Sequence, residues 1–361
     1  MPAFIPGLEL SNKFFKTEVQ PLLTEYFPKL RYSAALIGWG SEVLGFDTAR
    51  SRDHHWGPRV LLFLSNSDYA KLQRRVSQIL SKRLPYEFMG YSTNFSQPEA
   101  NGVRHPVRIS SGPVNHMINI YTPRSFFRAR LGIDPMRKIK VADWLVMPQQ
   151  RLLEVVSGDV FYDGLNQLDR IRAKLDFYPR DVWLYLLAAQ WKRISQEEAF
   201  VGRAGEVGDE LGSQIVAARL VREIVRLTLL MERQYAPYNK WLGSAFRTLR
   251  ISKKLGPVLR KVLLAKSWRV RQLALGEAYE IIVRRHNALK ITKPLPAKVS
   301  MYFNRPFLVI HGEYFTTEIR RAIKDPQVKR ITTDVGSVDQ LTDSNDLTIE
   351  MAKHLRIAYK N

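Results

Sequence analysis

The residues whose types and spacing best suit chemistry lie in one stretch, GWGSEVLGFDTARSRDHHWGPRVLLFL, residues 38–64. Glycine at position 40 lets a backbone approach a phosphate closely, and the hydroxyl of Ser41 and the turn amides can donate to phosphate oxygens. Asp53 and His55 stand two residues apart before an apolar run, and such side chains on a strand share one face. The pattern predicts a phosphate-binding turn, Gly40–Ser41, beside a metal-binding pair. The plain alternative is an ordinary turn, with Asp53 as a helix cap.

This arrangement resembles that of the nucleotidyltransferase superfamily, and most of all an uncharacterised family of domains of unknown function related to kanamycin nucleotidyltransferase. The segments that carry the resemblance are GSEVLGFDTARSRDHHWGPRVLLFL, HMINIYTPRSFF and QWKRISQEEAFVGRAGEVGDELGSQIVAARLVREIVRLTLLMERQYAPYNKW, within a similarity from about residue 3 to about residue 348. The resemblance implies a nucleoside triphosphate bound between an α/β domain and a helical domain, and transfer of a nucleotide to a small-molecule acceptor. The divalent metal of such a site would be Mg²⁺ or Mn²⁺.

The metal-ligand positions depart from that family pattern. By position, Asp53 keeps the first carboxylate, His55 stands at the second and Asn119 at the third. Imidazole is a poor ligand for Mg²⁺, and an amide oxygen carries no charge. The resemblance therefore implies a depleted metal site, and the alternative function is that of a catalytically inactive nucleotide- or nucleic-acid-binding relative.

The helical segment supplies the remaining candidate site residues. In the kanamycin type a carboxylate of the helical domain activates the acceptor hydroxyl, and the resemblance gives that role to Glu197 or Glu198; solvated carboxylates are the alternative. The residues predicted to bind phosphate or nucleotide are Gly40, Ser41, Arg59, Arg203, Arg219, Arg222, Tyr238 and Lys240. In ERQYAPYNKW, residues 232–241, aromatic rings beside cations could stack a base, or could form a packed helix corner.

Arginines recur along the helix predicted over these residues. Arg219, Arg222, Arg226 and Arg233 fall at spacings of three, four and seven, which predicts one shared helix face. Guanidinium groups on a largely apolar helix need anionic partners, since an unpaired buried charge is costly. The anionic partners could be carboxylates of the same chain or phosphates of a ligand. The candidate carboxylates are those of Asp209, Glu223 and Glu232.

Hydrophobic periodicity predicts the elements that position these residues. Strands are expected at 33–38, 59–65 and 116–122, and a strand-like segment at 307–315; helices are expected from Ser11 to about Phe27 and over 68–84. From Asp143 onward, apolar residues recur at three and four. The expected fold is α/β plus α: a small nucleotidyltransferase-like mixed sheet with helices at 1–140, a helical bundle at 141–295 and a mixed α/β extension at 296–361 that packs on the other two.

Composition limits the classes of partner. The 361 residues carry a formal charge of +22, and residues 246–293 hold thirteen Lys or Arg against two Glu. That segment is either a solvated face or a surface for nucleic acid. There is no cysteine, which excludes disulfides and thiolate metal sites. No signal peptide and no run of eighteen apolar residues is found, so we expect a cytoplasmic protein with no membrane partner.

Overall fold

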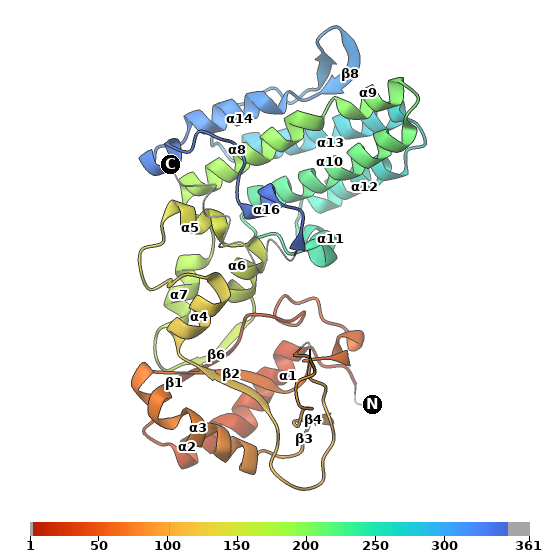
Figure 1. The fold of residues 1–361 in the computed structure, drawn as a ribbon. Coiled ribbons are helices and arrows are strands. Elements are labelled where there is room, and N and C mark those ends of the chain that lie inside the picture. The colour runs from red at the N-terminus through yellow and green to blue at the C-terminus, as the bar shows by residue number, and fades with distance from the viewer. Residues whose placement is uncertain (1–2, 101, 346–361) are drawn as a thin grey trace. The chain divides into compact units, whose positions relative to one another are not determined.

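The computed structural model describes residues 3–100 and 102–345 (Figure 1). Its backbone forms two compact units. The first unit joins Met1–Ile139 to Arg151–Asp176, and the second joins Lys140–Gln150 to Phe177–Asn361. The three predicted domains stay a prediction, and the compact units group the chain differently, since 151–176 packs with the N-terminal part.

A four-stranded mixed sheet organises the first unit, in the order β5-β2-β1-β6. Its strands are β1 (Tyr32–Leu36), β2 (Arg59–Leu64), β5 (Met117–Tyr121) and β6 (Asp159–Asp163). β2 and β5 are parallel, and β1 is antiparallel to both of its neighbours. The strands predicted from the first three apolar runs are thus confirmed.

Helices cover one face of this sheet and form its core. They are α1 (Gly7–Phe14), a π-helical turn η1 (Phe15–Val19), α2 (Gln20–Tyr26) and α3 (Asn66–Arg83). Phe14, Phe15 and Val19 are fully buried against alternate residues of the strands, such as Val60 and Leu62. This alternation places Arg59 and Phe63 on the other face of β2, where Phe63 packs against Phe126.

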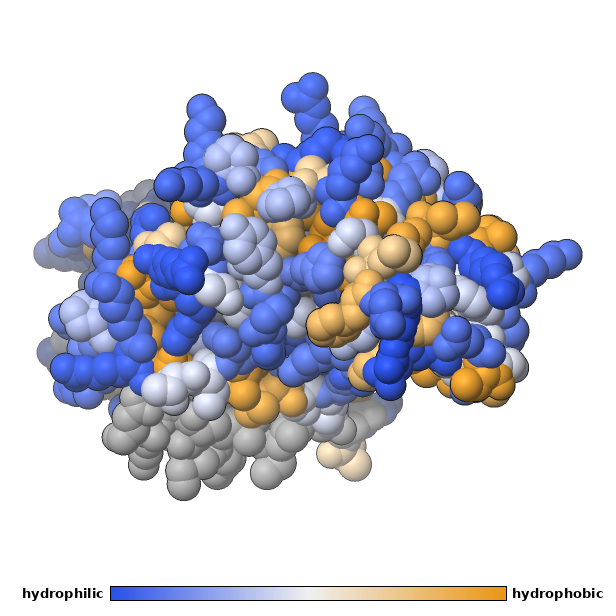
Figure 2. Space-filling model, turned by 90° about the horizontal axis from the view of Figure 1, so that it is seen from above, coloured by the Kyte–Doolittle hydropathy of each residue, from blue (hydrophilic) through white to orange (hydrophobic). Residues whose placement is uncertain are grey.

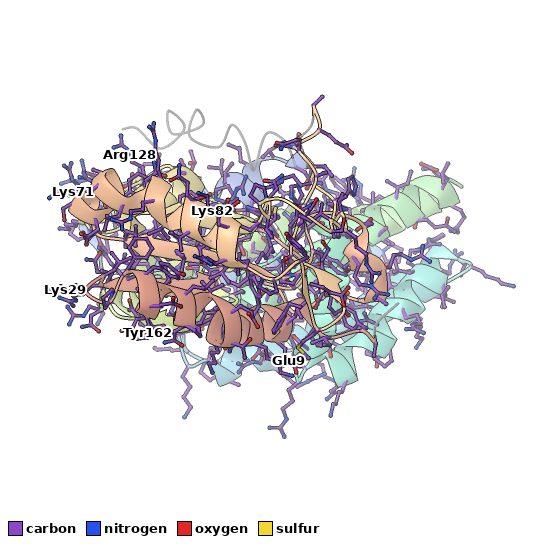
Figure 3. All side chains as sticks on the ribbon, turned by 90° about the horizontal axis from the view of Figure 1, so that it is seen from below. Glu9, Lys29, Lys71, Lys82, Arg128 and Tyr162 are labelled. Carbon is purple, nitrogen blue, oxygen red and sulfur yellow. The ribbon has the colours of Figure 1, made fainter. Side chains whose placement is uncertain are left out.

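Two helix boundaries test the sequence prediction. The first helix begins at Gly7, so its predicted start at Ser11 was wrong: Pro6 precedes the helix and Ser11 lies buried inside it. α3 begins near its predicted start, because Ser65 caps it by accepting a hydrogen bond from Asp68 N at 3.1 Å. Cations on the outside of this unit, among them Lys71 and Lys82, point into solvent (Figure 3).

The sequence reading missed β6, the edge strand that pairs with β1. Its sequence DVFYD is rich in β-formers, but it stands inside a long stretch of helical periodicity. The smaller elements of the first unit are η2 (Ala49–Asp53), β3 (Glu87–Phe88), β4 (Tyr91–Ser92), α4 (Pro123–Leu131) and α7 (Leu168–Leu175); α6 (Gln149–Val156) crosses the division between the units.

The second unit is mainly helical. Its elements are α5 (Val141–Val146), α8 (Arg180–Glu197), α9 (Phe200–Glu206), α10 (Glu210–Met231), α11 (Asn239–Thr248), α12 (Ser252–Leu264), α13 (Trp268–Ala288), β7 (Ser300–Tyr302), β8 (Arg305–Val309), α14 (Gly312–Arg321), α15 (Pro326–Lys329) and α16 (Val338–Leu341). α8 is the central helix: its residues from Val182 to Trp191 are all buried, and α14 runs along it (Figure 1). The surface in Figure 2 is largely hydrophilic, with separate apolar patches.

The strand predicted at 307–315 was half wrong. The chain is extended only to Val309, turns at His311 with a φ of +59°, and becomes helical at Gly312. Gly312 fits because a Cβ there would lie 2.9 Å from Trp191 O of α8. In the described part of the chain, no helix is both long and apolar enough to cross a bilayer.

Two helical glycines give a matched test of packing in the second unit. A Cβ at Gly205 would lie 2.1 Å from Trp268 Cγ, whereas one at Gly243 meets nothing within 4 Å. We expect Gly205→Ala to lower the free energy of unfolding by about 1–3 kcal/mol through overpacking, and Gly243→Ala to raise it by up to about 1 kcal/mol through helix propensity. Thermal unfolding of both variants measures this, and equal effects would contradict the packing at Trp268.

Candidate functional site

The predicted phosphate turn lies at the end of β1. Because β1 and β2 are antiparallel neighbours, the residues after Leu36 meet the start of β2 at Arg59. The turn opens with Gly38 at a φ of +92° and continues with Gly40 at +133°. Its position is tied down by Gly38 N, which donates to Glu154 O at 2.7 Å. The ends of these two strands thus place the Gly40–Ser41 turn beside Arg59.

Arg59 is buried and paired within the chain, although its Nε has no hydrogen-bond partner among the described residues. Its side chain and that of Glu42 are each 4% exposed and form an ion pair. Arg59 also donates to Trp39 O at 2.8 Å and lies 4.1 Å over the Trp39 ring. Through these contacts Arg59 holds the turn, and its direct binding of phosphate stays a prediction. Gly40 is required there, since a Cβ would lie 2.4 Å from Arg59 Nη2.

Three hydrogen-bond donors of the turn have no acceptor among the described residues. Ser41 is half-buried, and its carbonyl accepts from Phe46 N at 2.9 Å. Within the residues the structure describes, no hydrogen bond engages Ser41 Oγ or the backbone N–H groups of Gly40 and Ser41. Such donors at a glycine turn with positive φ suit an anion.

Arginines outnumber carboxylates in the ion pairs beside this turn. The arginines are Arg59, Arg130 and Arg151, and the carboxylates are Glu42 and Glu154. The Nε of Arg130, from α4, lies 3.6 Å from the position of a Cβ on Gly38. Arg130 is 4.0 Å from Glu154, which also pairs with Arg151 at 3.1 Å. Sequence reasoning missed Arg130, because only the packing of α4 brings it to the turn.

Asp53 and His55 do not take the strand geometry that their spacing suggested. Asp53 ends the 3₁₀ helix η2, and His55 has a φ of +52°, four residues before β2 begins. The Asp53 carboxylate is 65% exposed and lies 2.9 Å from Nδ1 of its neighbour His54. The two-residue alternation of a strand therefore does not apply to this pair.

The His55 ring faces the turn from the other side. It packs edge-on against Trp39, with 4.8 Å between ring centroids, and its Nδ1 is buried with no hydrogen-bond partner in the described chain. Burial, followed by the charges of Arg59 and His54, lowers the pKa of His55. The imidazole is thus neutral at neutral pH.

A loop that carried no motif packs on this segment. His55 N donates to Arg104 O at 2.9 Å, and the His105 ring lies 2.6 Å from Asp53 O and 3.0 Å from Glu99 Oε1.

Asn119 lies on β5, two residues beyond the partner of Arg59. It therefore shares the face of the sheet that carries Arg59.

The donor set does not fit a Mg²⁺ site. Asp53 contributes one carboxylate, which an imidazole already contacts; His55 and Asn119 add no charge. Among the described residues, no three His, Asp or Glu side chains lie close enough together to hold a metal ion. The Mg²⁺ or Mn²⁺ cofactor stays a prediction, and no chemical step is assigned to it here.

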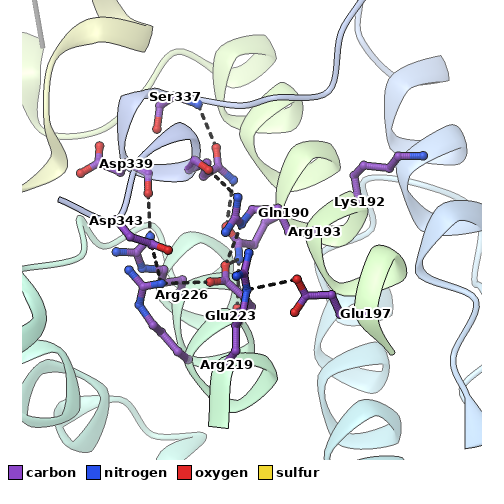
Figure 4. Close-up of polar contacts among 12 residues, drawn as sticks. Gln190, Lys192, Arg193, Glu197, Arg219, Glu223, Arg226, Ser337, Asp339 and Asp343 are labelled. Carbon is purple, nitrogen blue, oxygen red and sulfur yellow. Dashed lines mark hydrogen bonds and ion pairs between the residues drawn. The ribbon is translucent and has the colours of Figure 1, made fainter. Parts of the chain in front are cut away.

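The predicted anion-binding arginines of the second unit have partners in their own chain (Figure 4). Arg219 pairs with Glu197 at 3.1 Å, and Arg222 pairs with Asp343 at 2.6 Å. Glu223, which is 2% exposed, also contacts Arg222, at 3.5 Å. These side chains thus pair with carboxylates of their own chain, which is one of the two alternatives that the sequence left open.

The C-terminal segment completes this network. Arg226 donates to Asp339 O and Arg193 to Gln340 O, both at 2.6 Å. Burial raises the pKa of Asp339 to about 6. Arg233 was wrongly placed on the same helix face: α10 ends at Met231, and Arg233 follows it with a φ of +53°.

Glu198 is held by the backbone that follows β8. Its Oε2 accepts from Ile310 N at 2.7 Å and His311 N at 3.1 Å, and its Oε1 accepts from Gly312 N at 3.0 Å. Burial raises the pKa of Glu198 to about 7, although these N–H groups act against the rise. Glu198 clamps the start of α14; a role as catalytic base stays a prediction for it and for Glu197.

The other predicted nucleotide-binding residues are spread over the second unit. Arg203 lies over the ring of Phe200, 5.4 Å from its centre, and lines a surface pocket of about 580 Å³ between α9, α10 and β8. Tyr238 N donates to Gln150 Oε1 at 2.9 Å, and Lys240 lies 5.0 Å from the centre of the Trp241 ring. The packed-corner alternative for residues 232–241 agrees with these contacts.

Comparison with known families gives one result. The model of a family described as a domain of unknown function, DUF4037, matches residues 144–242, so this part of the chain contains a DUF4037 domain. The match takes in β6 and α7 of the first unit and α8, α9 and α10 of the second, and excludes residues 38–64. No curated protein matches the chain. The expected domain of unknown function is confirmed, and the nucleotidyltransferase relationship remains a prediction.

The Arg59–Glu42 pair predicts a non-additive effect on stability. Arg59→Met leaves a buried carboxylate without its partner, and we expect the free energy of unfolding to fall by about 3–5 kcal/mol. The double variant Arg59→Met/Glu42→Gln removes both charges, so it should recover at least half of that loss. Urea unfolding of the single and double variants measures the coupling; additive losses would contradict it.

Glu198 predicts a pH dependence with a defined sign. Its folded pKa of about 7 lies above the ordinary 4.5, so the native state retains a proton that the unfolded chain releases between these values. The contribution of Glu198 to the free energy of unfolding is therefore complete below pH 4.5 and falls by up to about 3 kcal/mol as the pH rises through 7.

Comparison with Glu198→Gln isolates this contribution, because other groups such as Asp339 titrate in both proteins. The free energy of unfolding of the wild type minus that of the variant should decrease from pH 4 to pH 8 in chemical denaturation. A difference that stays constant over this range would show that the carboxyl of Glu198 titrates normally.

Proposed function

We propose that the first unit binds the phosphate groups of a nucleoside triphosphate at the Gly40–Ser41 turn. The observation that carries the proposal is the unengaged set of donors, Ser41 Oγ and two backbone N–H groups, on a turn held open by glycines with positive φ. The excess of arginines over carboxylates around the turn supports it, since a bound anion balances that charge.

Arg130 is the side chain best placed to add to these backbone donors. It is 19% exposed, lies next to Gly38 and 5.9 Å from the centre of the Phe126 ring, and its contact with the carboxylate of Glu154 is long, at 4.0 Å. Arg59 instead supports the turn through Glu42 and Trp39. In this proposal Ser41 and Arg130 contact phosphate, and Arg59 is a positioning residue.

The donor set favours binding over two-metal nucleotidyl transfer. Transfer of a nucleotide needs counter-charge at the reacting phosphate, usually from metal ions on several carboxylates. Here Asp53 is the only carboxylate at the three positions, and His54 contacts it. We therefore infer that the protein is a nucleotide-binding relative of the nucleotidyltransferases; transfer to a small-molecule acceptor is the competing proposal.

Calorimetry with a nucleoside triphosphate in EDTA tests the binding. We expect the wild type to bind without metal, and Ser41→Ala/Arg130→Gln to weaken binding by about tenfold or more, the equivalent of one or two charged hydrogen bonds. Ser67→Ala, an exposed serine at the start of α3, is the matched control and should bind as the wild type does.

Absence of binding to all four common nucleoside triphosphates would contradict the phosphate site. Equal binding by Ser41→Ala/Arg130→Gln and by the control Ser67→Ala would also contradict it. Metal-dependent release of pyrophosphate, abolished by Asp53→Ala with the fold intact, would instead establish the transferase.

A further inference from the structure

Exposed apolar side chains gather where α12 turns into α13. Leu263 and Leu264 at the end of α12 are 52% and 72% exposed, and Val270 and Leu273 at the start of α13 are 45% and 60% exposed. Monomeric soluble proteins seldom expose such contiguous groups without a use. We call this surface the α12–α13 tip; it comprises Arg260, Lys261, Leu263, Leu264, Lys266, Arg269, Val270 and Leu273.

The residues of the tip lie on one face of the helix pair. On α12, Lys261 and Leu264 are three apart and share a side; on α13, Val270, Leu273 and Glu277 follow at three and four. Lys261 Nζ lies 3.8 Å from Glu277 Oε2, which brings the two rows together. The exposed rows of α12 and α13 are therefore neighbours on the surface.

This patch is additional to the core of the unit. The inward sides of both helices are filled by other residues, such as Leu259, Val262 and Ala274, all buried. The exposed side chains of the tip thus lie outside this packed core.

The charge around the patch is mainly positive, with Glu277 beside Lys261 and Glu210 beside Arg271 as acidic neighbours. Between Glu232 and Glu277 the sequence contains eleven Lys or Arg and no Asp or Glu. Of these, Arg271 is buried and pairs with Glu210, whereas Arg260, Lys261, Lys266 and Arg269 are exposed. A surface that mixes projecting leucines with cations complements an apolar phase covered by negative charge.

We propose that the α12–α13 tip binds the surface of an anionic lipid bilayer. The leucines enter the interface between headgroups and acyl chains, and the cations contact lipid phosphates and carboxylates. A second copy of the chain would bring like charges together, and a nucleic acid would leave the leucines in water. Binding of this kind requires no spanning helix, and it is independent of the nucleotide proposal.

Co-sedimentation of the full-length protein with vesicles tests this. The protein should sediment with vesicles of phosphatidylcholine mixed with phosphatidylserine, and much less with phosphatidylcholine alone. Leu264→Ser/Leu273→Ser should weaken the partition by about tenfold or more, and Lys266→Glu/Arg269→Glu should remove the preference for the anionic lipid. Thermal unfolding checks that the variants fold.

Met136→Ser is the matched control, because Met136 is 53% exposed and lies in the first unit. It should bind vesicles as the wild type does. Failure of the wild type to bind anionic vesicles, or equal loss in the control, would overturn the proposal. A salt-sensitive complex with RNA or DNA oligonucleotides, with vesicles left unbound, would also overturn it and assign the surface to nucleic acid.

Discussion

The need to neutralise buried guanidinium groups shapes both units of this protein. Arginine cannot lose its proton inside a protein, so each buried arginine requires an acceptor. Arg59 pairs with Glu42 and donates to the carbonyl of Trp39. Arg271 pairs with Glu210 and donates to the hydroxyl of Ser213. In a chain of net charge +22, carboxylates are scarce, so backbone carbonyls and hydroxyls are used as well.

This constraint separates the arginines that hold the fold from those that can meet a ligand. The sequence allows Arg222 and Arg226 to bind an anionic ligand. In the structure they instead donate hydrogen bonds to the segment that contains Asp339 and Asp343 (Figure 4). Arg130 is less committed, because its contact with Glu154 is long and Glu154 has a nearer partner in Arg151. The proposed phosphate site uses the less committed side chain.

Prediction from sequence succeeded where a local pattern controls the outcome. The apolar run in RVLLFLS and the alternation in HMINIYT identify two strands of the sheet, and glycines at 38 and 40 mark a turn with positive φ. It failed where local and tertiary signals compete. β6 was missed because its pairing with β1, and not the pattern of the neighbouring sequence, makes it a strand. Part of a predicted strand is helix α14, because Glu198 accepts hydrogen bonds from the N–H groups at the start of that helix.

The sequence by itself determined a basic, cysteine-free chain with a glycine turn before a buried strand and a long helical part. Those features follow from charge, residue type and periodicity, which need no partner elsewhere in the chain. Only the tertiary structure decided which ion pairs form, because Arg59 and Glu42, or Arg222 and Asp343, are brought together by the packing of separate elements. It also decided that Leu264 and Leu273 remain exposed, since helical periodicity shows which residues share a face but not which face is covered.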